Sequence, residues 1–457
     1  MSRVSLDSQG SVEYRPPFSG NSSPIESGAR RSGEATPEAE QHVREQCMNL
    51  APDFVRSSLQ LALELHEVIR ESAGSRNVLF SPFLLSSALV GLYNGARGRT
   101  ADQIARAAHL GYEEPRLVST CLPAWHAKLF PTWPDSNRRN FEMRHDNCLV
   151  YDKGLRLADG YKRWLSRWCR VEAEDFANDP TDGVVFPTRM TAWIGALTSF
   201  SCKTPEDASF WTEVDRTTSL FLLSILFIKG KWRHVFRVTR GFFHETPKKS
   251  KVVRMMSQTG HFRTAESAEL GASMLEIPYR EHKKTMVILV PDLPNTLRDL
   301  EGKLNAPQIL SCIERLEDNG PLSVSVPMFR VSDVVDLKEA LPALGVKDAF
   351  RPDADFSTLC DSAAGTVCLV RPTRGRVPCA RTFQQPDTQV QRSPAIRSLT
   401  QKAAPDMSTP PAADDDGEQQ EEQDKFIVDR PFLFLVMNSE PKAVLLFGSV
   451  RKIFAWK

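Results

Sequence analysis

An abrupt change of composition between Cys360 and Asp424 constrains the fold of this chain more than any other feature. Residues 371–402 hold seven basic side chains against one acidic one, and residues 414–424 then hold seven acidic ones. Blocks of like charge interrupted by prolines are typical of disordered segments. We therefore expect ordered structure in two pieces, about 47–360 and from Phe426 onward, separated by an atypical charged segment at 361–424.

The N-terminal 46 residues are rich in Ser, Gly, Glu, Pro and Arg, and such a segment cannot bury enough apolar surface to offset its ordering entropy. We expect a disordered tail over 1–46. It contains no apolar run of the kind that a secretory signal requires. The longest apolar stretch, 219–228, is half of the about 20 residues that span a bilayer, so we expect a buried strand there and no membrane segment.

Charge and cysteine usage exclude several classes of function. The 58 basic and 57 acidic residues leave a net charge of +1, so we expect no specific binding of nucleic acid. The nine cysteines are scattered and contain no C-x-x-C pair, which predicts neither a zinc site nor a disulfide framework. We expect no metal and no cofactor.

Periodicity predicts helices early in the chain. Phe54, Leu61, Leu65 and Val68 repeat at helical spacing and predict a helix over 53–72, with Asp53 as its N-cap. A short strand over 77–82 and a helical run over 84–93 follow. Residues 100–110 form a further predicted helix, with Thr100 and Gln103 placed as a capping box.

Strands dominate later. We expect strands at 148–151, 219–228, 285–290 and 322–328, a helix at 158–169, and two closing strands, 431–437 and 443–450, joined by a turn at 439–442. Helices early and strands late indicate an α+β fold.

Signatures of common enzymes are missing from the sequence. It contains no G-x-S-x-G, H-E-x-x-H, G-x-G-x-x-G or P-loop pattern. His66-Glu67 on the first predicted helix lacks a second histidine four residues later, so a structural role is the simpler interpretation. We expect no catalytic residues and no enzyme activity.

A series of motifs in one order carries the strongest signal. They are Asn77 to Phe83, Gly95 to Thr100, Asp175 to Pro180, Phe227 to Trp232, Glu276 to Tyr279, Val290 to Asp292, Pro327 to Phe329, Leu344 to Val346, and Asp429 to Phe434 with Phe447-Gly448. Together they resemble the serpins, the serine protease inhibitor superfamily, over about 53–357 and 426–457. The resemblance implies a single serpin-like domain over 47–457, interrupted by 361–424, with helices packed on a large mixed main sheet and with smaller β-sheets.

The resemblance also implies a mechanism. An inhibitory serpin presents an exposed reactive loop as a substrate, and the cleaved loop inserts as an extra central strand and drags the acylated protease with it. The implied partner is a serine protease, with a cysteine protease as the alternative, and the implied state is a monomer without membrane attachment. Most of the family is secreted, which implies an extracellular location, whereas the missing signal leaves the cytoplasm as the alternative.

Two sets of residues match the family. The region where the main sheet opens is matched by Asn77, Ser81, Pro82, Ser86, Ser224 and Trp232, and the fold landmarks by Gly95, Thr100, Pro431, Phe432 and Gly448. Three departures weaken the polar cluster of the opening region. Leu84 replaces a serine, Ser224 replaces an asparagine, and the histidine expected before 344–350 is missing.

The hinge of the reactive loop is the largest departure. A strand that enters the middle of a sheet needs small side chains and backbone N–H groups, so it excludes proline. Residues 391–401 carry Arg392, Pro394 and Arg397, and 409–413 contain two prolines. Either the chain is a non-inhibitory relative, or 361–424 is not native protein sequence but, for example, translated intron. Register from Pro431 places the reactive bond at Glu418, Gln419, Gln420 or Glu421.

Two other functions stay open. A serpin fold can serve as a binding or carrier protein that inhibits nothing. The basic run Lys248, Lys249 and Lys251 suggests a surface for a polyanion, which is the weaker alternative because charge runs are usually solvated surface.

Overall fold

The structure is a computed structural model of the 457-residue chain. It describes residues 37–111, 115–130, 141–174, 185–197, 220–280, 283–292, 296–333, 337–351, 354–360, 381–384 and 424–454. Within these ranges helices and two mixed sheets pack around one continuous hydrophobic core, which confirms the predicted α+β fold.

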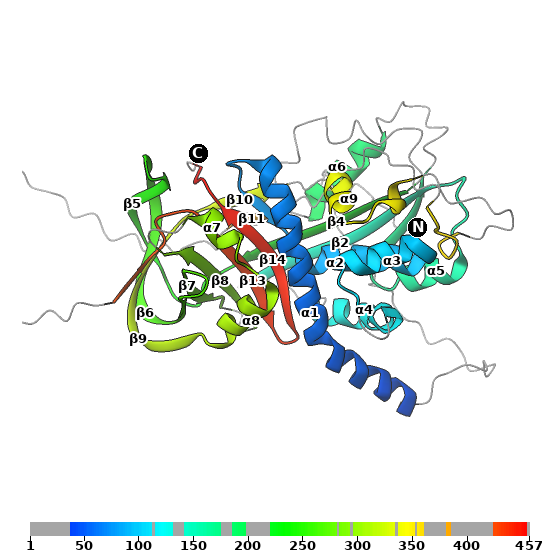
Figure 1. Ribbon diagram of the computed structural model, residues 1–457, viewed down its shortest axis with the longest axis horizontal. Helices are drawn as coiled ribbons and strands as arrows, with labels where there is room; N and C mark the ends of the chain where they lie inside the picture. Colours follow the sequence, from blue (N-terminus) through cyan, green and yellow to red (C-terminus); the bar gives the residue numbers. More distant parts are fainter. Residues whose placement is uncertain are drawn as a thin grey trace, which may run out of the picture.

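The larger sheet has nine strands among the described residues (Figure 1). In spatial order they are β1 (Val78–Phe80), β14 (Lys442–Val450), β13 (Phe432–Ser439), β8 (Lys284–Pro291), β7 (Ala272–Pro278), β6 (Lys249–Ser267), β9 (Glu317–Pro327) and β12 (Lys425–Ile427), with β5 (Arg237–Thr246) paired to β6. The closing hairpin β13–β14 lies between β1 and β8, next to the β1 edge of this order. Its residues are nearly all buried, which explains why they are apolar on both faces.

In the part of the chain that the structure describes, the smaller sheet has five strands, in the order β10 (Arg330–Asp333), β11 (Arg381–Gln384), β4 (Leu220–Gly230), β2 (Phe141–Asp152) and β3 (Arg170–Glu174). β2 pairs with β4 along nearly its whole length in antiparallel register. β11 is a strand inside the segment that the charge pattern predicted as disordered. Apart from β11 and Asp424, residues 361–424 lie outside the described residues.

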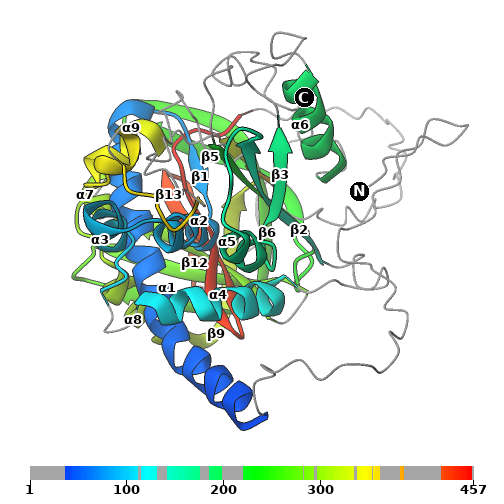
Figure 2. The same ribbon diagram turned by 90° about the vertical axis from the view of Figure 1, so that its right-hand side faces the viewer.

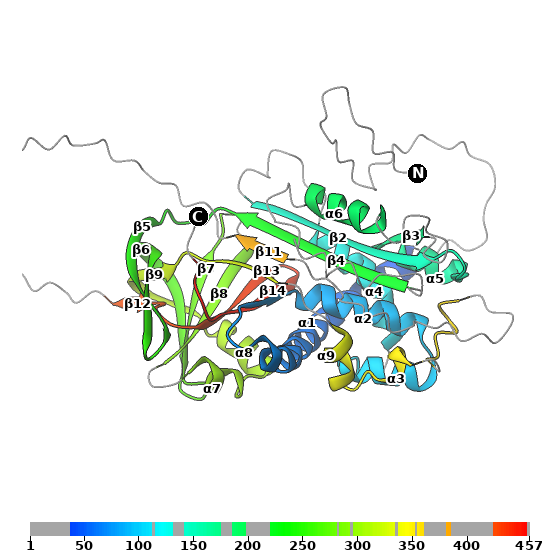
Figure 3. The same cartoon turned by 90° about the horizontal axis from the view of Figure 1, so that it is seen from above.

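Helices cover both faces of the five-stranded sheet. α6 (Val185–Leu197) lies over one face of β2, and α2 (Pro82–Gly95) and α4 (Pro115–Leu129) lie on the other side (Figure 3). The remaining helical elements are α1 (Pro37–Ala73), α3 (Gly98–Ala107), α5 (Asp159–Leu165), α7 (Leu297–Glu301), α8 (Ala306–Glu314), α9 (Leu337–Ala343) and a 3₁₀ turn at Asp348–Phe350. Figure 2 shows α1, α2, α3 and α4 on the side of β13, and α6 on the opposite side beyond β2 and β3.

The first helix begins earlier than predicted. α1 starts at Pro37 and continues through Pro52, so 37–46 are helical, and residues 1–36 lie outside the described residues. A disulfide between Cys47 and Cys121 ties the first half of α1 to α4, and the Trp125 indole N–H donates to the Cys47 carbonyl at 3.1 Å. These tertiary links hold a helix through a proline that would end an isolated one.

This disulfide also corrects the expectation from the cysteine spacing. The two cysteines are 74 residues apart and meet only because α1 and α4 pack together. Cys148, Cys169 and Cys312 are free and buried, and Cys360 is buried as well. Spacing identifies only local cysteine patterns, so a single long-range pair escapes it.

The capping box predicted at Thr100 and Gln103 is wrong. α3 begins at Gly98, and its N-cap residue Arg97 makes no side-chain cap bond. The Thr100 hydroxyl instead accepts the backbone N–H of Asp355 at 3.0 Å, and the Gln103 carbonyl accepts those of Lys347 and Asp348 at 2.8 Å each. Both side chains therefore anchor the chain that leads toward Cys360.

Candidate functional site

The centre of the five-stranded sheet contains a weakly joined seam. β11 pairs with β10 in antiparallel register over its four residues, but it meets β4 in parallel orientation at one register position, Phe383 opposite Ile228. Parallel pairing is slightly less stable per residue than antiparallel pairing. The boundary between β11 and β4 is therefore the place where this sheet separates most easily.

The chain beyond this seam runs from one sheet to the other. It leaves the five-stranded sheet at Gln384 and enters the nine-stranded sheet at Lys425, where β12 pairs in parallel with β9. The candidate reactive bond residues Glu418, Gln419, Gln420 and Glu421 fall in this connection and lie outside the described residues. Their role stays a prediction.

A polar layer lies beneath β2 and β4. Ser81 is fully buried and caps α2, because its hydroxyl accepts the Leu84 backbone N–H at 3.2 Å. Pro82 is the first residue of the helix, and Ser86 is buried with a hydroxyl that has no hydrogen-bond partner among the described residues. α2 packs against β4, the strand that carries the buried Ser224.

Sequence reasoning missed two members of this layer. Asn147 on β2 lies directly opposite Ser224 and is fully buried. Its amide therefore lies next to Ser224, the residue that replaces the asparagine of the family. His126 on α4 is 4% exposed, and its Nε2 lies 3.0 Å from the hydroxyl of Ser87. The spacing of Leu122, His126 and Leu129 on one helix face is the signal that could have found this histidine.

Burial determines the protonation of His126. Desolvation, reinforced by the nearby His145, holds its pKa well below the usual value. The ring stacks at 5.0 Å on Trp168 and packs near Phe130. The neutral imidazole can thus hydrogen-bond under the sheet without bringing a buried charge.

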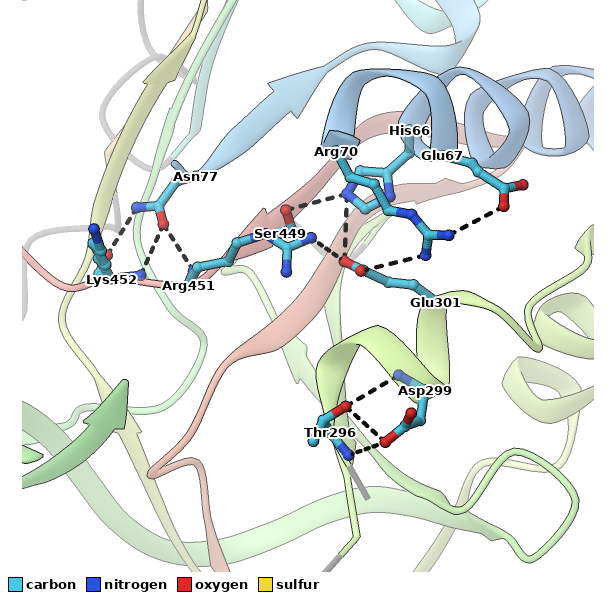
Figure 4. Close-up of polar contacts among 10 residues, drawn as sticks. All are labelled: His66, Glu67, Arg70, Asn77, Thr296, Asp299, Glu301, Ser449, Arg451 and Lys452. Carbon is cyan, nitrogen blue, oxygen red and sulfur yellow. Dashed lines mark hydrogen bonds and ion pairs between the residues drawn. The ribbon is translucent and has the colours of Figure 1, made fainter. Parts of the chain in front are cut away.

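Trp232 and Asn77 do not join this layer. Trp232 follows β4 and stacks on Tyr279, with ring centroids 4.6 Å apart, at the end of the strand. Asn77 precedes β1, where its side chain accepts the backbone N–H groups of Arg451 and Lys452 and donates to the Lys452 carbonyl (Figure 4). The six matched residues are therefore distributed over three places.

The segment held by Asn77 belongs to a larger buried cluster. Glu301 at the end of α7 is 2% exposed in its side chain and pairs with Arg451 and, at 3.8 Å, with Arg70 of α1 (Figure 4). His66 lies 3.7 Å from the same carboxylate and 3.2 Å from the Ser449 hydroxyl. Burial and the two arginines lower the pKa of His66 to about 3, so it is neutral at physiological pH.

The fold landmarks lie in close-packed positions. Phe432 is fully buried at the start of β13 and directly follows Pro431. A side chain at Gly448 would meet the Val78 carbonyl oxygen at 2.7 Å, and one at Gly95 would meet Leu359 at 2.9 Å. Both glycines therefore permit close backbone approach.

α6 is fastened across the sheet by a polar contact. The Trp193 indole N–H donates to the Asp146 carboxylate at 3.2 Å, and Arg170 pairs with the same carboxylate while lying over the Trp193 ring. Burial raises the pKa of Asp146, and Arg170 opposes that rise. α6 is thus anchored to both β2 and β3.

The lysines of the proposed polyanion surface lie at the β5–β6 hairpin. Lys249 pairs with Glu245, and the Lys251 ammonium donates to the Ile453 carbonyl at 2.9 Å. Two of the three cations are thus engaged within the protein. Among the residues that the structure describes, no three His, Cys, Asp or Glu side chains gather where they could hold a metal, and no helix is long and apolar enough to cross a membrane.

Comparison with known families decides what this arrangement is. The sequence profile of the family described as serpin (serine protease inhibitor) matches residues 56–453. The chain belongs to the serpin family. This confirms the predicted resemblance across both ordered pieces of the chain.

Curated relatives and solved structures agree with this assignment. Iris from Ixodes ricinus is 30% identical over 412 residues, which cover 89% of this serpin and 99% of the relative. Intracellular coagulation inhibitor 2 from Tachypleus tridentatus is 27% identical over 391 residues, 83% and 86% of the two chains. The solved structure of mouse protein-Z dependent protease inhibitor is 19% identical with a TM-score of 0.71, covering 90% of this chain and 100% of that one. Uncleaved ovalbumin reaches a TM-score of 0.67 at 20% identity, with 87% and 99% covered.

Proposed function

We propose that this serpin inhibits a serine protease by presenting the chain between β11 and β12 as bait. The family description and the name of the Tachypleus tridentatus relative support inhibition. The observation that carries the proposal is the seam between β11 and β4. The chain that follows β11 is the segment best placed to enter this seam after cleavage.

The direction of the strands favours entry at this place. β11 and β4 run parallel, so a segment that folds back from Gln384 would lie antiparallel to both. The single parallel contact would be replaced by two antiparallel ladders, which are more stable. The predicted opening residues Ser81, Pro82 and Ser86 lie on α2 or at its start, which packs against β4, and Ser224 lies on β4 itself. We assign these four residues the role of a polar layer over which the strands slide apart.

The residues after Gln384 limit this step. Pro386 and Pro394 cannot donate to a ladder, and Arg392 and Arg397 are too long to slide between strands. After cleavage, with the bait bond at Glu418 to Glu421 by register, slow insertion thus competes with deacylation and release of the protease. We assign a serine protease as the partner, with a cysteine protease as the alternative.

Incubation with a panel of serine proteases, followed by denaturing gel electrophoresis, tests the proposal. We expect a covalent complex of serpin and protease for at least one enzyme, together with a large fraction of cleaved, uncomplexed serpin. The matched control is the same reaction with a catalytically inactive protease, which can form no acyl bond. Clean cleavage by every enzyme of the panel, without any complex, would sink the proposal.

That outcome would support the second candidate, a binding protein on the same fold. The prolines after β11 favour it, because they oppose insertion but not the fold itself. The human thyroxine-binding globulin structure, complexed with its hormone, has a TM-score of 0.65 at 17% identity, so the fold is shared. Thermal unfolding before and after cleavage separates the two candidates, since only insertion raises stability.

We also propose an extracellular location, with the cytoplasm as the alternative. The Cys47–Cys121 disulfide supports an oxidising compartment, because cytosolic thiols are kept reduced. The name of the Tachypleus relative is evidence for intracellular members among similar proteins. Measurement of the disulfide in protein isolated from its source distinguishes the two locations.

Removal of this disulfide is expected to destabilise the protein measurably. Cys47→Ser combined with Cys121→Ser should lower the free energy of unfolding by about 3 kcal/mol, because the bridge closes a long loop in the unfolded chain. Urea unfolding with and without reductant gives the readout. Reductant should weaken the wild type to the level of the double variant and leave the double variant unchanged. Equal effects of reductant on both proteins would show that the bridge contributes no stability.

A further inference from the structure

The β5–β6 hairpin presents a face whose composition is unusual for free surface. Alternate residues of β5 and β6 point outward, and Phe242 and Val252, directly opposite each other, are 61% and 58% exposed. The other face is buried through Phe243, Val253 and Met255. We call the outward-facing set Arg240, Phe242, His244, Ser250, Val252 and Arg254 the outer hairpin face.

Two like charges are paired on this face. Arg240 lies directly opposite Arg254 in the register of the hairpin, and both side chains are exposed. Within the described residues neither has an ion-pair partner. Like charges directly opposite each other destabilise a sheet. This arrangement costs stability unless an anion lies between or beside the two guanidinium groups.

The backbone of β5 also has a free edge here. The His244 N–H points away from β6, since it donates to the Asp429 carbonyl at 2.7 Å. Alternation along an antiparallel strand directs the N–H and C=O groups of Arg240 and Phe242 to the same side. In the described ranges these groups have no backbone partner beyond the hairpin. Figure 1 shows β5 at the outer end of the nine-stranded sheet.

We propose that the outer hairpin face binds an extended acidic segment of a partner protein, which adds as a strand to the free edge of β5. A carboxylate of that segment lies beside Arg240 on β5, and Arg254 lies next to Arg240 on β6. An apolar side chain two residues later in the segment packs on Phe242. The backbone of the segment bonds to Arg240 and Phe242. Edge addition of this kind draws affinity from main-chain hydrogen bonds and specificity from alternate side chains.

The apolar pair favours a protein segment over a sulfated polysaccharide. A polysaccharide would use the arginines but leave Phe242 and Val252 in water, and it offers no amide ladder to β5. The basic run beside this face is mostly engaged, since Lys249 and Lys251 have partners within the chain. The cations of the outer hairpin face itself are Arg240 and Arg254.

The test uses the full chain and a fluorescein-labelled peptide, Ser-Thr-Glu-Thr-Val-Thr-Glu-Thr, in which Glu and Val alternate with Thr. Fluorescence anisotropy is expected to show saturable binding in the micromolar to low-millimolar range. Arg254→Glu should weaken binding about tenfold. The same variant should raise the melting temperature by about 1 °C, because it replaces a like-charge pair by an opposite-charge pair. A loss of binding with a gain of stability cannot come from misfolding.

Further variants separate the contributions. Phe242→Ser removes the apolar contact from an exposed position and should also weaken binding, whereas Arg167→Glu, an exposed arginine beyond α5, should leave it unchanged. N-methylation of alternate peptide amides should abolish binding if the backbone ladder forms. If no binding is seen at a peptide concentration of about 1 mM, where even weak edge addition should be detected, the proposal is wrong. A second pair of results would also overturn it. These are heparin binding that depends on Arg240 and Arg254, together with equal binding of the N-methylated peptide and the parent peptide.

Discussion

Replacement of residues 386–397 by an alternating alanine–threonine segment of equal length is expected to convert most protease encounters of this serpin into covalent complexes. The replacement removes Pro386, Arg392, Pro394 and Arg397 from the segment that must enter between β11 and β4. Small side chains with free N–H groups can pair with both neighbouring strands. The rate of insertion should then exceed the rate of deacylation.

The thermal stability of the cleaved protein gives a second readout for this prediction. About ten new backbone hydrogen bonds, at about 1 kcal/mol net each, should stabilise the cleaved variant by about 10 kcal/mol. For about 400 folded residues this corresponds to a rise of about 12 °C in melting temperature. The wild type should show a smaller rise after cleavage, because the prolines and arginines after β11 limit insertion without abolishing it.

A matched control carries the same replacement with one proline at its centre. Because a single proline removes a ladder bond and clashes in a central strand, this control should form little complex and should not gain stability on cleavage. Equal trapping by both variants would show that insertion at the β11–β4 seam does not drive inhibition. Both variants are tested with the proteases that form a covalent complex with the wild type.

Glu301→Gln is expected to lower the free energy of unfolding by about 4 kcal/mol. The Glu301 carboxylate is 2% exposed and compensates Arg70 and Arg451, which are 16% and 15% exposed (Figure 4). Burial raises the pKa of Glu301, and the two arginines oppose that rise. Without the carboxylate, Arg451 loses its ion-pair partner and Arg70 keeps only the exposed Glu67, so two poorly solvated cations face each other beside a neutral His66.

Urea unfolding of Glu301→Gln and of a matched variant, Glu314→Gln, provides the measurement. Glu314 is 67% exposed and pairs with Lys442, so its loss should change stability by about 0.5 kcal/mol. The Glu301 variant should also be more easily cleaved by proteases after β14, because Arg451 no longer holds the C-terminal segment. Similar stability losses for the two variants would refute a special role of the buried cluster.

Local sequence patterns predicted much of the fold. The closing strands were expected at 431–437 and 443–450 and occur as β13 and β14, and the turn between them was predicted at its observed place. These elements are apolar on both faces, so their type follows from composition alone. The motif order identified the family, which the match over residues 56–453 confirms.

The candidate site was only partly predictable. Ser81 and Ser224 were expected in the opening region and lie beneath β4 or upon it, whereas Asn77 instead holds Arg451 and Lys452. Asn147 was missed because its place opposite Ser224 depends on strand register. Assignment of an opening role to these residues stays a prediction.

The sequence by itself determined the family and the presence of prolines and long basic side chains after β11, because these depend on residue type and on neighbours along the chain. Tertiary structure decided the Cys47–Cys121 bridge, the helix through Pro52, the β11–β4 seam and the Glu301 cluster. Each of these joins residues far apart in the chain. Their contacts are set by how helices and strands pack, and no local spacing encodes that packing.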